Sequence, residues 1–244
     1  MLSIVSLFAA TALLQCIASG HIIKDTKRDL DNQLSPHVAP PPRRSKLHMF
    51  VRVPEPITLS RSPLGVVATC HAAGNPAPNV MWMKNGIPVA DYEEQTNEIR
   101  SVSPDSVAMV TSRLVVAAVS GDVLTCVAVA GLKDTSRSEM YDEDGDYDTL
   151  PAPIITESYS DVFQQMGTSL TLPCRVASAG RYEVDWWVND ERVYGNPRLR
   201  VLPSGDLRIN NLVFADLGNY TCTVRDGFGQ TSESTFLYPV KPSN

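Results

Sequence analysis

The stretch ADLGNYTC, Ala215–Cys222, carries two signals at once. Its D-x-G-x-Y-x-C residues fall at every second position, which is the period of a strand with one face in a core. The tripeptide that starts at Asn219 is also an N-glycosylation acceptor, which belongs on a surface. Because side chains alternate between the two faces of a strand, Asn219 and Thr221 must point outward if Tyr220 and Cys222 point inward. We therefore predict a strand with a core face and an outer face, and we expect Asn219 to be glycosylated.

The chain repeats one spacing of cysteine and tryptophan. In each copy a tryptophan follows the first cysteine by twelve residues, and a second cysteine comes after several short strand-like segments: Cys70, Trp82 and Cys126 in the first copy, Cys174, Trp186 and Cys222 in the second. This spacing is typical of an immunoglobulin sandwich, in which the tryptophan packs against a disulfide that joins the two sheets. Such a bridge stabilises a small domain by about 4 kcal/mol on the chain-entropy model. The predicted fold is therefore all-β, with two tandem immunoglobulin-like β-sandwiches of the intermediate set, each with one inter-sheet disulfide.

The second copy follows the immunoglobulin pattern more closely than the first. In the second copy, GDLRINNL predicts a strand with Leu207, Ile209 and Leu212 on its inward face, and D-x-G-x-Y-x-C is the signature of a tyrosine corner. In the first copy, TCHAAGNPAPNVMWMKNGIPV predicts two strands of an intermediate-set domain. However, SGDVLTC places Ser, Asp and Leu where the corner needs Asp, Gly and Tyr. Domain one is thus expected to lack the tyrosine corner.

The remaining segments set the boundaries of the two domains. We predict a signal peptide at 1–20, a flexible, proline-rich, basic leader at 21–53, domain one at 54–138, an acidic linker at 139–152, domain two at 153–240 and a tail at 241–244. The first residues form an apolar run followed by small residues, which is typical of a secretory signal, with an uncleaved membrane anchor as the alternative. No later run approaches the ~18–20 apolar residues of a transmembrane helix. The expected product is a secreted, extracellular protein without membrane insertion.

Charge and motifs exclude several classes of function. The net charge of −6 argues against a nucleic-acid partner. The sequence has no nucleophile elbow, phosphate loop or zinc-protease motif. The four cysteines after the signal lie too far apart for a typical zinc site, and the alternating aspartates of 142–148 lack the glycine and glutamate positions of a calcium loop. We therefore predict a binding module that is not an enzyme and has no catalytic, cofactor-binding or metal-binding residues.

Strand alternation predicts where a protein partner would bind. In domain one Trp82 faces inward, so Met81 and Met83 on either side of it face outward. On the neighbouring strand of the same sheet, Val127 and Val129 face outward as well. An outer face with four apolar side chains usually marks an interface, and methionine suits an adaptable one.

This apolar face of domain one has alternative explanations. The leader, domain two folding back or residues 90–106 would equally cover it, and a homodimer is a further alternative. In domain two, Trp186 matches the core tryptophan by spacing, which leaves Trp187 on the outer face. An exposed tryptophan is a candidate hot spot for a partner. A glycan at Asn219 would partly screen the face on which Trp187 lies.

The second half of the chain resembles a known protein family. The run PAPIITESYSDVFQQMGTSLTLPCRV and the motifs LPSGDL and TFLYPV are similar to the second domain of secreted two-immunoglobulin proteins. This family includes the insect neural and ectodermal development factor and the nematode zwei-Ig proteins. The likeness spans both domains and is specific from about residue 153 to residue 240, whereas domain one and the linker match only in general plan. It implies that Cys70 pairs with Cys126 and that Cys174 pairs with Cys222.

The resemblance also implies a function. The insect members bind insulin-like peptides outside the cell and restrain growth, and the nematode members help to keep axons in position. We accordingly expect a secreted protein that sequesters an insulin-like or growth-factor peptide and antagonises its receptor, without any chemistry. The alternative is an extracellular adhesion or neuronal-maintenance factor that binds a cell-surface protein. The family has no short ligand-binding motif to carry over, so the contact residues named above come from alternation alone.

Overall fold

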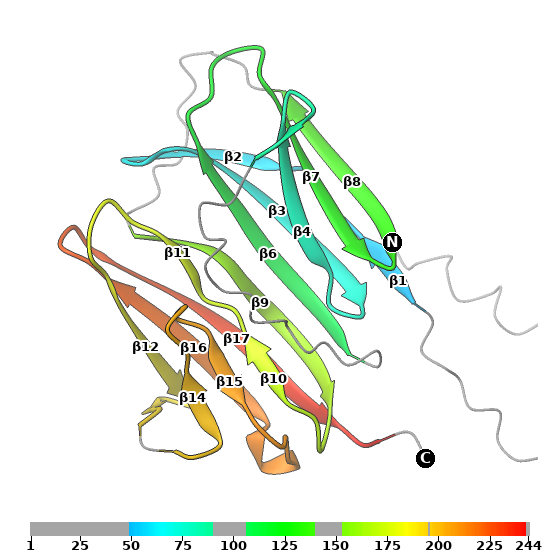
Figure 1. The fold of residues 1–244 in the computed structure, drawn as a ribbon, viewed down its shortest axis with the longest axis vertical. Coiled ribbons are helices and arrows are strands. Elements are labelled where there is room, and N and C mark those ends of the chain that lie inside the picture. Colours follow the sequence, from blue (N-terminus) through cyan, green and yellow to red (C-terminus); the bar gives the residue numbers. More distant parts are fainter. Residues whose placement is uncertain (1–48, 90–105, 140–152, 195, 243–244) are drawn as a thin grey trace, which may run out of the picture. The chain divides into compact units, whose positions relative to one another are not determined.

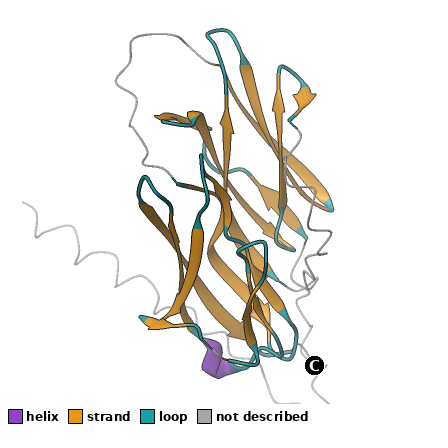
Figure 2. Ribbon diagram, turned by 60° about the vertical axis from the view of Figure 1, so that its left-hand side comes forward, coloured by secondary structure: helices purple, strands orange, loops and turns teal. Residues whose placement is uncertain are grey.

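β-strands are the main secondary structure of the part of the chain that the structure describes (Figure 1). The computed structural model describes residues 49–89, 106–139, 153–194 and 196–242. In these residues Figure 2 shows strands in both domains and a single helical turn, the 3-10 helix η1 (Phe214–Asp216). The strands of domain one are β1 (Phe50–Arg52), β2 (Thr58–Ser62), β3 (Gly65–Asn75), β4 (Asn79–Lys84), β5 (Ile87–Pro88), β6 (Val107–Val116), β7 (Val123–Ala130) and β8 (Leu132–Glu139). Those of domain two are β9 (Ile154–Gln165), β10 (Leu170–Leu172), β11 (Arg175–Ala177), β12 (Glu183–Val188), β13 (Glu191–Arg192), β14 (Leu199–Val201), β15 (Leu207–Ile209), β16 (Gly218–Arg225) and β17 (Gln230–Val240).

Several predicted segments lie outside the described residues. These are the signal peptide, the leader up to residue 48 and the linker from residue 140 to residue 152, which contains the aspartates considered for calcium. Of the segment 90–106, considered as a cover for the apolar face of domain one, residues 90–105 also lie outside. Within the described ranges, no helix is long and apolar enough to span a bilayer.

Domain one is a sandwich of two sheets. One sheet has the order β5-β4-β7-β8, and the other contains β1, β2, β3 and β6 around the central strand β3. The disulfide Cys70–Cys126 joins β3 to β7 across the sandwich, with 6.4 Å between the two Cα atoms. Trp82 on β4 is buried beside it and donates a hydrogen bond from its indole nitrogen to Ser112 Oγ at 3.0 Å. The bridge and the packed tryptophan are those that the spacing of cysteine and tryptophan predicts.

Domain two is the second sandwich. Its smaller sheet has the order β10-β15-β14, and its larger one the order β9-β17-β16-β12-β13. The disulfide Cys174–Cys222 joins the residue just before β11 to β16 across the sandwich, again with 6.4 Å between the Cα atoms. Trp186 is buried beside this bridge and donates to the Gly205 carbonyl at 2.8 Å. Both domains therefore have the predicted disulfide and the predicted core tryptophan.

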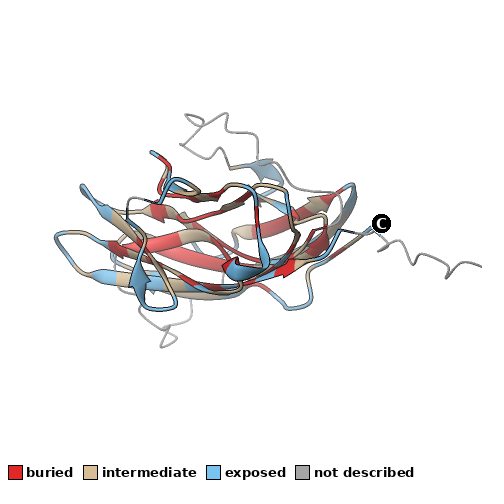
Figure 3. Cartoon of the chain, turned by 90° about the horizontal axis from the view of Figure 1, so that it is seen from below, coloured by how far each residue is buried: buried red, intermediate tan, exposed pale blue. Residues whose placement is uncertain are grey.

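The predicted alternation in the second copy is confirmed. Leu207, Ile209 and Leu212 are each fully buried. The hydroxyl of Tyr220 donates to the backbone carbonyl of Asp216 at 2.8 Å, which is the hydrogen bond that defines a tyrosine corner. Figure 3 shows buried residues concentrated along the strands and exposed residues along the connecting loops, as expected for packed sheets.

The edge strands β6 and β9 join the two domains into one sheet. β6 of domain one pairs antiparallel with β9 of domain two, so ten strands form a continuous ladder (Figure 1). The pairing also joins the cores, because Ala108 and Val110 on β6 are buried in the hydrophobic cluster of domain two. Arg113 adds polar contacts across the junction: Nη2 lies 2.8 Å from Glu233 Oε1 and Nη1 donates to the Ile155 carbonyl at 3.0 Å. Nothing in the sequence pattern predicted this pairing.

The first strand lies within the range predicted as leader. β1 pairs antiparallel with the end of β3, and Val51 is buried against Ala72, Ala128 and Ala130. The strand structure of domain one therefore begins at Phe50, before the predicted boundary at residue 54. A strand of three residues has too little alternation to be recognised beside a proline-rich tract.

Candidate functional site

The last strand, β17, exposes two aromatic rings on one face. In the sequence TFLYP, Leu237 is fully buried in the core of domain two. The alternation of the strand then places Phe236 and Tyr238 on the opposite face, where 38% and 39% of their surfaces are exposed. The apolar side chains of β17 are thus on both faces, which is unusual for a strand at the surface of a sandwich.

Neighbouring strands add two more apolar side chains to this face. β9 pairs in parallel with β17, so that Tyr238 lies opposite Phe163, and their ring centroids are 5.7 Å apart. β6 lies on the other side of β9 and brings Met109 opposite Asp161, which in turn lies opposite Phe236. Residues that are paired across neighbouring strands share a face of the sheet. We define the junction patch as the four exposed residues on this face: Met109, Phe163, Phe236 and Tyr238.

The junction patch exists only because the domains share a sheet. Met109 comes from domain one and the other three residues come from domain two. Their exposed fractions lie between 38% and 43%, so each ring or thioether is anchored in the sheet and still reachable from solvent. Aromatic and methionine side chains in adjacent positions are typical of the centre of a protein interface. A rigid sheet also holds them in place before a ligand arrives, which reduces the entropy lost on binding.

The predicted apolar face of domain one is only partly available. The register is as expected, with Met81 opposite Val127 and Asn79 opposite Val129. Met81 is 50% exposed, and Met83 and Val129 are half-buried. Val127, however, is only 3% exposed, so the prediction that it lies open to a partner is wrong. Alternation gives the direction of a side chain but not how far its neighbours cover it, and Val127 lies on β7 between the paired strands β4 and β8.

The predicted hot spot in domain two is also less exposed than expected. Trp187 is half-buried on β12, where it lies opposite Thr221 of β16 on one side and Arg192 of β13 on the other. The prediction that Trp187 stands free in solvent is therefore corrected, because the short edge strand β13 lies alongside it. Trp187 still belongs to the same sheet as the junction patch.

The two faces of the opening motif are as predicted. Tyr220 and Cys222 are buried to 1% exposure, whereas Asn219 is exposed. Thr221 Oγ1 forms a hydrogen bond of 2.9 Å with Ser234 Oγ on the outer face. Asn219 lies directly opposite Phe236 in the register of β16 and β17, so the sequon borders the junction patch.

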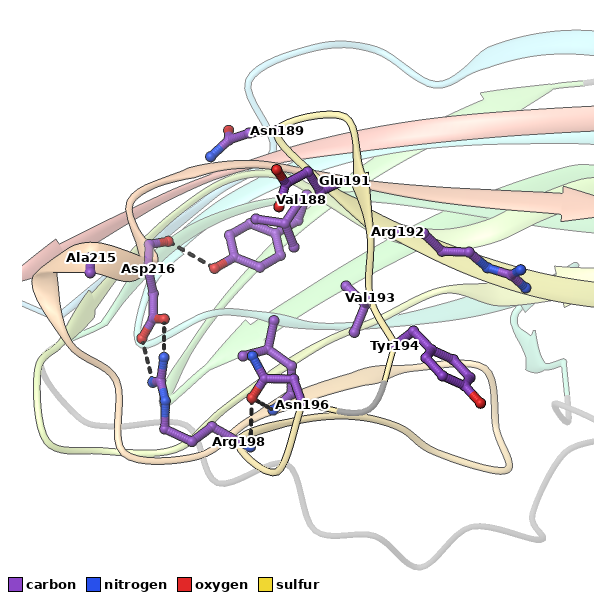
Figure 4. Close-up of a pocket in the computed structure, with 12 residues that line it drawn as sticks. Val188, Asn189, Glu191, Arg192, Val193, Tyr194, Asn196, Arg198, Ala215 and Asp216 are labelled. Carbon is purple, nitrogen blue, oxygen red and sulfur yellow. Dashed lines mark hydrogen bonds and ion pairs between the residues drawn. The ribbon is translucent and has the colours of Figure 1, made fainter.

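A pocket of about 500 Å³ lies beside the start of β16 in domain two and is lined in part by Asn189, Asp216 and Tyr220 (Figure 4). In Figure 4 the side chains of Arg198 and Asp216 face each other, and the guanidinium donates two hydrogen bonds of 2.9 and 2.7 Å to the carboxylate. Burial raises the pKa of Asp216, but the hydrogen bonds from Arg198 and from the Val213 amide outweigh it, so this pKa lies below its ordinary value. Arg198 and Asp216 therefore pair with each other, which joins the segment before β14 to the helical turn η1.

The described residues provide no metal cluster. Among them, no group of three His, Cys, Asp or Glu side chains is close enough together to hold a metal ion. The junction patch offers exposed apolar surface that a partner could cover.

Comparison with known proteins places the chain in a family. Residues 153–238 match the immunoglobulin I-set domain, and residues 53–137 match the CD80-like C2-set immunoglobulin domain. The zwei Ig domain protein zig-4 of Caenorhabditis elegans is 30% identical over 185 residues, which cover 70% of this chain and 72% of that protein. The chain belongs to the two-immunoglobulin family of zwei Ig domain proteins.

Other members of the two-immunoglobulin family agree with this placement. The neural/ectodermal development factor IMP-L2 of Drosophila melanogaster is 26% identical over 231 residues, which cover 88% of this chain and 86% of that protein. The crystal structure of IMP-L2 superposes with a TM-score of 0.62 at 23% identity, over 80% of this chain and 96% of that one, and shows the same fold. The predicted family is thus confirmed, with domain one matching a C2-set rather than an intermediate-set description.

Sequence reasoning missed the junction patch although part of its signal was visible. The alternation in TFLYPV places Phe236 and Tyr238 on the face opposite Leu237, and the same reasoning applies to Phe163 beside the buried Val162. The place of Met109 in the patch could not be predicted from the sequence, because Met109 joins the patch only through the pairing of β6 with β9.

Proposed function

We propose that this two-immunoglobulin protein is a secreted binding protein that sequesters an insulin-like peptide through the junction patch. The observation that carries the proposal is the set of four exposed apolar side chains from three adjacent strands and both domains. The family resemblance drawn from the second domain supports a peptide hormone as the ligand. The protein would act by covering surface that the hormone presents to its receptor.

The chemistry of the patch suits such a ligand. The receptor-binding surface of an insulin-like peptide is itself partly apolar, so it loses unfavourable contact with water on docking to Met109 and the aromatic rings. Asp161 lies half-buried in the same row as Met109 and Phe236 and offers a carboxylate for a polar contact. Competition with a receptor requires nanomolar affinity, which corresponds to about −12 kcal/mol. Aromatic side chains that become buried in a complex are the kind of contact that reaches this range.

The second candidate is an extracellular adhesion or neuronal-maintenance factor. The observation that favours it is the match to zig-4, because the resemblance implies that the nematode members keep axons in position. Its partner would be a cell-surface protein, and weak binding would suffice because several contacts act together at a membrane. This candidate predicts no tight one-to-one complex with a small soluble peptide.

The test is calorimetric titration of the secreted chain with an insulin-like peptide. We expect nanomolar one-to-one binding, weakened by about 2 kcal/mol or more, roughly 30-fold, in the variant Phe236→Glu. The matched control is Phe228→Glu, the same substitution at a phenylalanine that is 75% exposed on the hairpin between β16 and β17, away from the patch. This control should bind like the parent.

A second pair of variants separates the two apolar faces. Met109→Glu lies in the junction patch and Met81→Glu in the outer face of domain one, and their side chains are similarly exposed, at 43% and 50%. Loss of binding in Met109→Glu alone supports the junction patch. Loss in Met81→Glu alone would move the site to domain one, and no heat with the parent would favour the adhesion candidate.

A further inference from the structure

The single sequon of the chain has an open position at the rim of the junction patch. Asn219 is the second residue of β16 and is exposed. Among the described residues, none forms a hydrogen bond with its side-chain amide, whereas its backbone N–H donates to Asn189 Oδ1 at 3.0 Å. The backbone of Asn219 is therefore fixed while its side chain remains available for modification.

We propose that Asn219 carries an N-linked oligosaccharide that closes one side of the junction patch. In the reaction the amide nitrogen of Asn219 loses a proton and bonds to C1 of a lipid-linked oligosaccharide. The bond from C1 to the lipid diphosphate breaks, and the diphosphate leaves with its electron pair. The hydroxyl of Thr221, which the sequon requires, is bonded to Ser234 Oγ in the folded sheet. Transfer therefore precedes the pairing of β16 with β17.

The register of the sheet determines which part of the patch the oligosaccharide covers. Phe236 lies directly opposite Asn219, and paired side chains on one face are about 5 Å apart at Cβ. Met109 lies in the same row but three strands away, at a distance of about 14 Å. The oligosaccharide thus restricts the approach of bulky groups to Phe236 from the β16 side and leaves Met109 open. The consequence for an insulin-like ligand, which must then approach from the β6 side, rests on the proposed function.

The first experiment measures occupancy. The full chain, secreted from eukaryotic cells, is weighed by mass spectrometry before and after treatment with peptide N-glycosidase. We expect a loss of glycan mass with deamidation at position 219, and no glycan in Asn219→Gln or Thr221→Ala. The matched control is Thr223→Ala, because Thr223 Oγ1 forms the same cross-strand bond, 3.0 Å to Ser232 Oγ, but lies outside the sequon. An unmodified Asn219 in the parent would overturn the proposal.

The second experiment measures access without any ligand. Cysteine is introduced as Phe236→Cys or as Met109→Cys, and the rate of labelling by a bulky maleimide is compared with and without the additional change Asn219→Gln. We expect removal of the glycan to speed labelling severalfold at position 236 and to leave position 109 unchanged. Equal rates at position 236 would refute the covering of the patch. A failure of the proposed function would appear instead as absent peptide binding while both results here still hold.

Discussion

The corner that leads into the second cysteine-bearing strand of each sandwich, β7 in domain one and β16 in domain two, is held by different residues in the two domains. In domain two, Tyr220 bonds to the Asp216 carbonyl, and the Asp216 carboxylate accepts hydrogen bonds from Arg198 and from the Val213 amide. Domain one has Leu124 in the position of the tyrosine, where it is fully buried. The corner of domain two therefore contains a buried tyrosine hydroxyl, whereas the corner of domain one has a leucine at that position.

Domain one uses a carboxylate at a different place in the corner. Asp122, two residues before Leu124, lies 2.9 Å from Lys84 Nζ and accepts hydrogen bonds of 2.8 Å from Asn85 Nδ2 and 2.9 Å from the Val119 amide. This cluster lies at the surface, whereas Asp216 is buried to 6% exposure. Each domain thus has a hydrogen-bonded carboxylate at this turn, and we expect the more deeply buried one to contribute more to stability.

The largest predicted effect on stability comes from removing the buried carboxylate of Asp216. Asp216→Ala leaves the Arg198 guanidinium and the Val213 amide without their acceptor, so we expect the free energy of unfolding of domain two to fall by about 3 kcal/mol. Chemical denaturation measures this change. The matched variant Asp122→Ala should lower the free energy of unfolding by less. A larger decrease in Asp122→Ala than in Asp216→Ala would contradict this expectation.

A substitution in domain one should destabilise domain two. Val110 on β6 is buried in the core of domain two, and Val110→Ala removes two methyl groups and leaves a cavity. We expect a loss of about 2 kcal/mol. Hydrogen exchange of the β16 amides localises the effect to domain two. Unchanged exchange of β16, with faster exchange only in domain one, would show that the shared core does not couple the domains.

The hydroxyl of the tyrosine corner should contribute less than the carboxylate. Tyr220→Phe removes one buried hydrogen bond without a change of shape, so the free energy of unfolding should decrease by about 1 kcal/mol. Tyr194→Phe is the control, because Tyr194 is 90% exposed. If the two variants unfold at the same denaturant concentration, the hydrogen bond of the tyrosine corner has no net effect on stability.

The smallest predicted effect is a dependence of the stability of domain one on pH. Hydrogen bonds from Lys84, Val119 and Asn85 lower the pKa of Asp122 to about 2, below its ordinary value near 3.8. Because the folded-state pKa is depressed, the stabilisation is present above pH 4 and is lost as the pH falls from about 4 to about 2. Comparing parent and Asp122→Asn between these pH values checks this: the parent should lose stability relative to the variant as the pH falls. Parallel curves for the two proteins would contradict it.

The sequence predicts the parts of the fold that depend on short-range patterns. The spacing of cysteine and tryptophan predicts both sandwiches, and alternation around Tyr220 correctly separates its core face from Asn219. The cover over Val127 and Trp187 was not predictable, because it depends on neighbouring strands and not on the strand's own period. The pairing of β6 with β9 was not predictable either, since it joins edges of two domains whose patterns are each complete alone.

The central claim is that the junction patch is the binding surface. Hydroxyl-radical footprinting with mass spectrometry tests it directly, because methionine and aromatic side chains are oxidised in proportion to their exposure. On addition of an insulin-like peptide, oxidation of Met109, Phe163, Phe236 and Tyr238 should decrease, while oxidation of Met81, which is 50% exposed on the other apolar face, should not change. Protection of Met81 with an unchanged junction patch would contradict the claim.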